Sequence, residues 1–296
     1  MTLYRVRHQT LYTYEAPVLH AHHLAHLRPR RFDFQIARRT LLEINPSPRD
    51  QHRQEDYFGN DCDVLEVLSP HERFEIIATS EIEIKERLAL TRVAEEPHKS
   101  LSWNSAADLL GKEPRLLFAR EYCFDSPLVR VHPMLREYAE PSFGAGRPLL
   151  DAVLELSDRI HSDFKYQPLS TDVSTPLAQV MRERRGVCQD FAHVMIGCLR
   201  SMGLGARYVS GYLETVPPPG QPRMVGSDAS HAWVAAFLPG VGWLDVDPTN
   251  ALLPNQSHIT VACGRDFSDV SPLKGVVLGG GRHYVKVGVD VQRLAD

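Results

Sequence analysis

Alternating hydrophobic and polar positions dominate the first 95 residues. Residues 4–14 are rich in aromatic and β-branched side chains with polar residues between them, as is typical of a half-exposed strand. The same alternation recurs in three further segments, at residues 39–45, 62–68 and 73–85. Turn-forming proline, glycine and asparagine residues separate these segments, and none shows helical spacing. The pattern predicts an antiparallel, all-β amino-terminal domain over residues 1–95.

The spacing of apolar residues becomes helical between about residues 100 and 203. It predicts a helix after Pro148, a short helix over about 176–185, and a third helix from near Cys188 to Gly203. Further strands are expected at residues 205–214, 231–238, 242–247, 273–279 and 282–291. Residues 96–296 are therefore expected to form an α+β domain, in which a central helix packs on an antiparallel sheet.

The composition fits a soluble globular protein. Of the 296 residues, 43% are hydrophobic and 24% are charged, so the chain can bury a core. Its 33 basic and 37 acidic residues give a net charge of −4, which argues against a nucleic-acid partner or a membrane surface. No apolar run approaches the ~18–20 residues that span a bilayer, and the first residues lack a secretory h-region. Five cysteines are few and odd in number, so a reduced, cytoplasmic compartment is expected.

Cys188 is the candidate nucleophile. It falls in the first turn of a predicted helix, where free N–H groups and the helix dipole favour a thiolate. The same N–H groups could bind the oxyanion that forms when sulfur attacks a carbonyl carbon. The alternative is a small core residue, but Cys198 has the spacing of a buried helix face, whereas Cys188 stands at the helix end beside polar residues.

A nucleophilic cysteine requires a histidine base and a group that orients the histidine. Among fourteen histidines, His231 begins the predicted strand 231–238, and a glycine-containing turn leads into the returning strand that ends at Asp247. A hairpin of this kind places His231 and Asp247 at the same end, which makes Asp247 the candidate orienting residue. Asp245 projects to the same face and is the alternative for that role.

Four segments resemble, in order, the motifs of the bacterial transglutaminase-like family, a branch of the papain-like cysteine enzymes. They are Gly186–His193, Gly203–Gly211, Ser230–Trp233 and Gly242–Thr249. The opening segments His8–Tyr14 and Leu27–Arg30 resemble the β-rich domain that often precedes this catalytic domain. The resemblance implies a papain-like fold for residues 96–296, with Cys188 as nucleophile, His231 as base and Asp247 as orienting residue.

Other residues carry weaker signals. His20, His22, His23 and His26 could ligate a metal, which would allow a metallohydrolase, but no cysteine pair or His-Glu-x-x-His helix supports one. A polar surface is the favoured interpretation of this cluster, and no calcium loop is present, so no cofactor is expected. Additional residues could shield the triad or line its cleft, namely Tyr166, Asp172, Ser174, Gln189, Trp233 and Trp243.

The expected chemistry is acyl transfer through a thioester on Cys188. The substrate would be a peptide or protein whose amide bond is attacked, and water or an amine would then resolve the acyl-enzyme. Hydrolysis is favoured over amine transfer because no lid is evident, and the segment Pro217–Pro222 is too short to seal a site. The alternative of another class is a catalytically silent binding module that keeps the fold.

Overall fold

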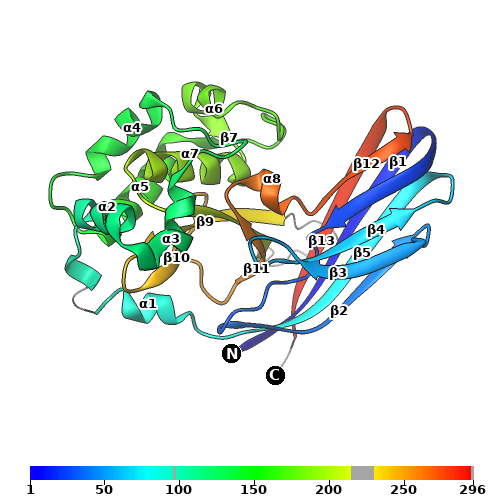
Figure 1. The fold of residues 1–296 in the computed structure, drawn as a ribbon, viewed down its shortest axis with the longest axis horizontal. Helices are drawn as coiled ribbons and strands as arrows, with labels where there is room; N and C mark the ends of the chain where they lie inside the picture. The colour runs from blue at the N-terminus through cyan, green and yellow to red at the C-terminus, as the bar shows by residue number, and fades with distance from the viewer. Residues whose placement is uncertain (96–97, 215–229, 295–296) are drawn as a thin grey trace, which may run out of the picture.

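The long strand β1 (Thr2–Ala25) is the centre of a curved half-barrel sheet in the computed structural model, which describes residues 1–95, 98–214 and 230–294. The sheet has the strand order β2-β5-β1-β4-β3, and β12 and β13 also pair with β1 (Figure 1). Its other strands are β2 (Gln35–Asn45), β3 (Asp50–Glu55), β4 (Asp61–Val67), β5 (His71–Ile84), β12 (Leu273–Gly279) and β13 (His283–Leu294).

Strand β1 pairs with different strands along its two halves, and its register with β5 shifts between Thr13 and Val18. Its first half lies between β5 and β13, and its second half lies between β4 and β12. Alternate residues of the first half, including Tyr4, Val6 and His8, are buried on one face. This alternation is the sequence signal that predicted a β-rich N-terminal region, and the fold confirms the strands.

The two C-terminal strands join the N-terminal sheet. The sequence analysis grouped residues 273–279 and 282–291 with the region 96–296, whereas β12 and β13 pair with β1. The pattern of apolar residues locates a strand but carries no information about its partner, so the grouping was wrong while the strand positions were right. Strand β3 was missed because its six residues contain no apolar side chain and are all exposed.

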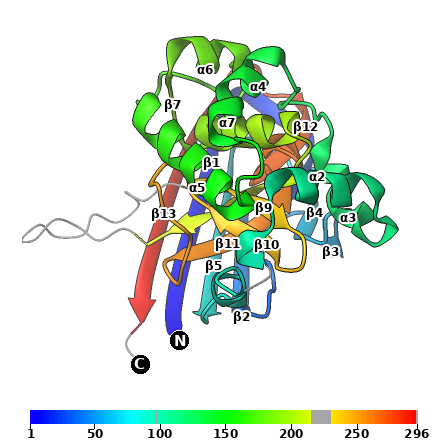
Figure 2. The same ribbon diagram turned by 90° about the vertical axis from the view of Figure 1, so that its left-hand side faces the viewer.

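The second region combines helices with a four-stranded antiparallel sheet of order β10-β9-β8-β11. Figures 1 and 2 show this small sheet between the helices and the large sheet. The strands are β6 (Lys165–Tyr166), β7 (Arg185–Gly186), β8 (Ala206–Leu213), β9 (Ser230–Leu238), β10 (Gly242–Val246) and β11 (His258–Gly264). The helices are α1 (Leu88–Arg92), α2 (Trp103–Lys112), α3 (Leu117–Arg120), α4 (Pro133–Ala139), α5 (Leu149–Asp163), α6 (Leu177–Glu183), α7 (Cys188–Ser201) and α8 (Phe267–Val270).

Helix α7 is the central helix of the second region. All of its residues from Asp190 to Ser201 are buried, and it packs against α4, α5, α6 and β9. A helix that is buried on nearly all sides belongs inside a core. Gly203 follows it with φ +76°, a conformation that suits glycine and ends the helix as the sequence predicted. No helix in the described ranges is both long and apolar enough to cross a membrane.

The edge of β11 is closed by two buried side-chain amides from the N-terminal region. The side chain of Gln35 donates to the carbonyl of Thr260 at 2.6 Å and accepts from its N–H at 2.8 Å. Asn60 makes the equivalent pair of bonds with the backbone of Cys263, both at 2.8 Å. Because an amide offers one donor and one acceptor side by side, each amide replaces part of a missing neighbouring strand. These bonds join the two sheets.

The place of β13 in the first sheet can be tested by two substitutions on that strand. Val291 is fully buried and pairs with Val6, whereas Val287 is 48% exposed. Val291→Asp would bury an unpaired charge and should lower the free energy of unfolding by about 3 kcal/mol or more. Val287→Asp should change it by about 0.5 kcal/mol or less in urea titrations. Equal losses from both substitutions would contradict this pairing.

Candidate active site

Cys188 is the first residue of α7, and its side chain is half-buried. The turn before it is held by Asp190, whose carboxylate accepts from the Val187 N–H at 2.8 Å and from the Thr171 hydroxyl at 2.6 Å. A Cβ at Gly186 would lie 2.5 Å from the Asp190 carboxylate, so only glycine fits there. The Gly-Val-Cys-Gln-Asp sequence therefore forms a tight turn that places Cys188 at the start of the helix.

His231 lies between Cys188 and Asp247. Its Nε2 donates to the Asp247 carboxylate at 2.7 Å, and Cys188 lies close enough to the same imidazole to raise its pKa. Since Nε2 is engaged by Asp247, Nδ1 is the nitrogen that is available to the sulfur. The structure thus brings together Cys188, His231 and Asp247, the three residues that the sequence analysis selected.

The Asp247 carboxylate is fully buried and accepts five hydrogen bonds. One oxygen accepts from His231, from His258 Nε2 at 3.2 Å and from the Asn250 amide at 2.7 Å. The other accepts from the N–H groups of Thr249 and Asn250, at 2.9 and 3.2 Å. Burial by itself would raise the pKa of Asp247, but the bonds from His231 and His258 hold it well below its usual range. The residue therefore remains a carboxylate.

The electrostatic state of His231 follows from these partners. Burial by itself would lower the pKa of the imidazole, but the hydrogen bonds and negative charges of Asp247 and Cys188 raise it to about 10. A proton therefore stays on His231 at neutral pH. A protonated imidazole next to the sulfur is the partner that a nucleophilic cysteine requires.

Asp245 lies outside this hydrogen-bonded chain. Its carboxylate forms an ion pair with the buried Arg87 and accepts from the indole N–H of Trp233 at 3.1 Å. No hydrogen bond joins it to His231 within the described residues. Asp245, the alternative orienting residue of the sequence analysis, is instead part of the contact between the end of β5 and the small sheet.

His258 and Asn250 are additional residues of this site that sequence reasoning missed. Both bond the Asp247 carboxylate, and the imidazole of His258 is buried, which lowers its pKa despite the nearby Asp247 charge. His258 begins β11, a strand whose seven residues are all buried. Because complete burial removes the alternation of apolar and polar residues, neither the strand nor its histidine stood out.

The aromatic residues that the sequence analysis considered as shields or cleft walls of the candidate site differ in burial and in their neighbours. Trp233 is fully buried, with its ring 5.9 Å from that of His231. Tyr166 is 52% exposed and lies near enough for the Cys188 charge to raise its pKa, in addition to burial. Trp243 instead packs against Tyr122, with ring centroids 5.1 Å apart.

Three further residues, Gln189, Asp172 and Ser174, were also candidates for lining the cleft. Gln189 is half-buried beside Cys188. Asp172 accepts from the Ser174 hydroxyl at 2.6 Å, within the loop before α6. The segment Pro217–Pro222 lies outside the described residues.

The histidine cluster of β1 divides between the two faces of the sheet. His20 and His22 face Glu66, at 3.3 and 3.7 Å, and these three could hold a metal ion. His23 stacks on Phe74 on the buried face. His26 is also buried, bonded to Asp56 and to a backbone carbonyl.

A second set of potential metal ligands in the described ranges is His231, Asp247 and His258. Their mutual hydrogen bonds account for their closeness without an ion, because the histidine N–H groups satisfy the carboxylate.

Comparison with known proteins agrees with this architecture. Residues 4–83 match the bacterial transglutaminase-like N-terminal region, and residues 136–248 match the transglutaminase-like superfamily. An uncharacterised protein of Mycobacterium tuberculosis is 39% identical over 298 residues, covering 97% of this chain and 92% of that protein. An uncharacterised protein of Mycobacterium leprae is 31% identical over 297 residues, covering 98% and 99%.

Two further similarities concern the fold and the core. The crystal structure of a candidate cysteine protease from Cytophaga hutchinsonii has a TM-score of 0.75 at 20% identity, covering 100% of this chain and 91% of that one. A protein-glutamine gamma-glutamyltransferase of Pseudomonas aeruginosa is 34% identical over 99 residues, covering 32% of this chain and 15% of that protein. The fold is a β-rich half-barrel followed by an α+β core. The chain belongs to the transglutaminase-like superfamily, with the bacterial transglutaminase-like N-terminal region before the core.

The reactivity of the cysteines tests the position of Cys188. Burial raises the pKa of Cys198 to about 12, whereas Cys188 is half-buried and lies beside the protonated imidazole of His231. Iodoacetamide at neutral pH should therefore modify Cys188 at least tenfold faster than Cys198, as followed by peptide mass spectrometry. His231→Gln should slow the reaction at Cys188 and leave Cys198 unchanged. Equal rates at the two cysteines in the wild-type protein would contradict the arrangement.

The ion pair of His231 can be measured by NMR titration of the imidazole. In the wild-type protein the ring should remain protonated from acid pH through neutrality and lose its proton near pH 10. The folded pKa exceeds the ordinary 6.5, so this interaction stabilises the fold fully below pH ~6.5, and that stability is lost as the pH rises through about 10. Asp247→Asn should lower the pKa of His231.

Asp245→Asn is the matched control, because Asp245 bonds Arg87 and Trp233 instead of His231. It should leave the titration of His231 unchanged. A wild-type imidazole that titrates at or below 6.5, or a larger shift in Asp245→Asn than in Asp247→Asn, would show that the assignment of partners is wrong.

Proposed function

We propose that this protein is a cysteine hydrolase that cleaves amide or peptide bonds through a thioester on Cys188. The observation that carries the proposal is the grouping of Cys188 with His231, whose imidazole bonds the buried carboxylate of Asp247 at 2.7 Å. Nucleophilic catalysis by a cysteine requires a base that is held in place by a hydrogen bond to a fixed carboxylate. Peptides or proteins are the proposed substrates.

The reaction proceeds in two displacements. The Cys188 thiolate attacks the amide carbonyl carbon, and the C–N bond breaks as the proton of His231 passes to the departing nitrogen. The product amine leaves, and the acyl group remains on sulfur as a thioester. A water molecule then attacks this carbon and gives a proton to His231, and the C–S bond breaks to release the acid and restore Cys188. Asp247 stabilises the imidazolium at each stage.

Water is the proposed acceptor because Cys188 is only half-buried and the neighbouring Tyr166 is 52% exposed. Trp233 is fully buried, with its ring 5.9 Å from that of His231. Water is present at about 55 M, so an open site favours hydrolysis by mass action. The Pseudomonas relative named a protein-glutamine gamma-glutamyltransferase supports amine transfer as the second candidate, since its similarity covers part of the core.

The test is to incubate the protein with a library of glutamine-containing peptides and a labelled primary amine, and to separate the products by mass spectrometry. Cleaved or deamidated peptides should dominate, and Cys188→Ala should abolish them, with a loss of several orders of magnitude in rate. Asp247→Asn should reduce the rate strongly, and Asp245→Asn should reduce it less, provided that both variants stay folded.

Two other outcomes would overturn the proposal in distinct ways. Amine adducts that dominate and disappear in Cys188→Ala would replace hydrolysis by transfer, while keeping the nucleophile. Peptides that bind without any product or acyl-enzyme, although Cys188 reacts with iodoacetamide, would identify a silent binding module.

A further inference from the structure

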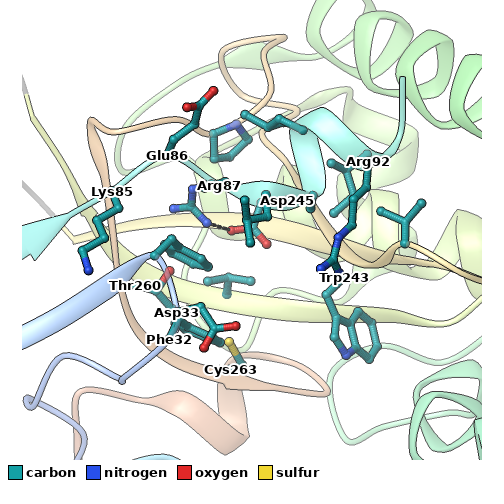
Figure 3. Close-up of a pocket in the computed structure, with 18 of the residues that line it drawn as sticks. Phe32, Asp33, Lys85, Glu86, Arg87, Arg92, Trp243, Asp245, Thr260 and Cys263 are labelled. Carbon is teal, nitrogen blue, oxygen red and sulfur yellow. Dashed lines mark hydrogen bonds and ion pairs between the residues drawn. The ribbon is translucent and has the colours of Figure 1, made fainter. Parts of the chain in front are cut away.

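A cavity of about 500 Å³ lies between the two sheets, away from the nucleophile (Figure 3). One wall is the segment after β5 with helix α1, and the opposite wall is formed by residues of β8, β10 and β11. Cys188 and His231 are not among the residues that line it. Cavities of roughly 300–1,000 Å³ are of the size that holds a small organic ligand.

The walls of the cavity are largely apolar and aromatic. Phe32 and Phe34 come from the segment before β2, with their rings stacked 4.9 Å apart, and Trp243 comes from β10. Leu90 and Val241 add aliphatic surface. Such a lining suits the apolar body of a ligand and leaves a few polar groups to set its orientation.

Arg207 of β8 is a partly buried cation of this cavity for which the described residues supply no counter-charge. Its guanidinium lies 4.5 Å from the ring centroid of Trp243 and 6.0 Å from that of Phe32. Its Nε is buried and has no hydrogen-bond partner, and no carboxylate pairs with it within the described ranges. Arg87, which also lines the cavity, differs because Asp245 neutralises it (Figure 3). A guanidinium that lines an apolar cavity and has no carboxylate partner among the described residues can pair with an anionic ligand.

The chemistry of this ligand follows from the geometry of the guanidinium. An arginine presents N–H groups in a planar fork that matches the two oxygens of a carboxylate. The exposed acids Asp33 and Glu86 line the same cavity and disfavour a doubly charged phosphate. We propose that the cavity binds a small carboxylate with an apolar body, whose carboxylate pairs with Arg207 while its hydrocarbon part lies among Phe32, Phe34 and Trp243. This site is independent of the proposed reaction at Cys188.

Isothermal titration of the whole protein with octanoate, 1-octanol and octylamine tests this site. Octanoate should bind, and Arg207→Met should weaken it by tenfold or more, because a charge-assisted hydrogen bond is lost. The same variant should bind 1-octanol as the wild type does. Arg73→Met removes an exposed arginine on β5 that is far from the lining and should leave octanoate binding unchanged. Ala89→Trp, which fills the cavity from α1, should abolish binding of both ligands.

Several outcomes would overturn the proposal. These are the absence of octanoate binding to the wild-type protein, equal affinity for octylamine, or octanoate binding that Ala89→Trp does not affect. Unchanged octanoate affinity in a folded Arg207→Met would also do so. Should Arg207→Met fail to fold, Arg207→Lys retains the charge without the fork and is expected to weaken octanoate at least threefold. Unchanged affinity in that variant would count against the site.

Discussion

The hydrogen bonds that Gln35 and Asn60 make with the edge of β11 connect the two halves of this protein. Without them, β11 would expose unpaired backbone groups at the interface, which is costly wherever water is excluded. The position of β11 determines two other features. It carries His258, which bonds the Asp247 carboxylate, and it supplies Thr260 and Cys263 to the cavity between the sheets. The N-terminal half-barrel is therefore part of the framework that holds the candidate active site.

A second connection runs through Arg87, at the junction of β5 and α1. Its guanidinium pairs with Asp245 and donates to the carbonyl of His258 at 3.0 Å. The central carbon of the guanidinium lies 4.1 Å from the centroid of the Phe34 ring. Asp245 in turn accepts from Trp233, whose ring packs beside His231. A charge buried as deeply as that of Asp247 is stable only when its donors are fixed in place. The contacts between the two halves thus help to fix His231 and His258, which donate hydrogen bonds to the Asp247 carboxylate.

Much of the fold could be predicted because its elements have one buried and one exposed face. The alternation in β1 and β5 and the helical spacing in α5 match their observed burial. Two strands that lack this contrast were missed. Strand β3 is exposed on every residue and β11 is buried on every residue, so neither shows a period of two. His258, which begins β11, was missed for the same reason.

The sequence by itself determined the local groups of the candidate site: Cys188 at a helix start after a glycine, and His231 and Asp247 at one end of a hairpin. Spacing along the chain sets these relations, since a helix start and a hairpin end are local features. Only the tertiary structure decided which strands pair with β1, that Asp245 bonds Arg87, and that His258 and Asn250 complete the surroundings of Asp247. Contacts between β1 and β13, or between Arg87 and Asp245, join residues far apart in the chain. The periodic pattern of apolar residues shows which positions are buried but not which distant residue each one meets.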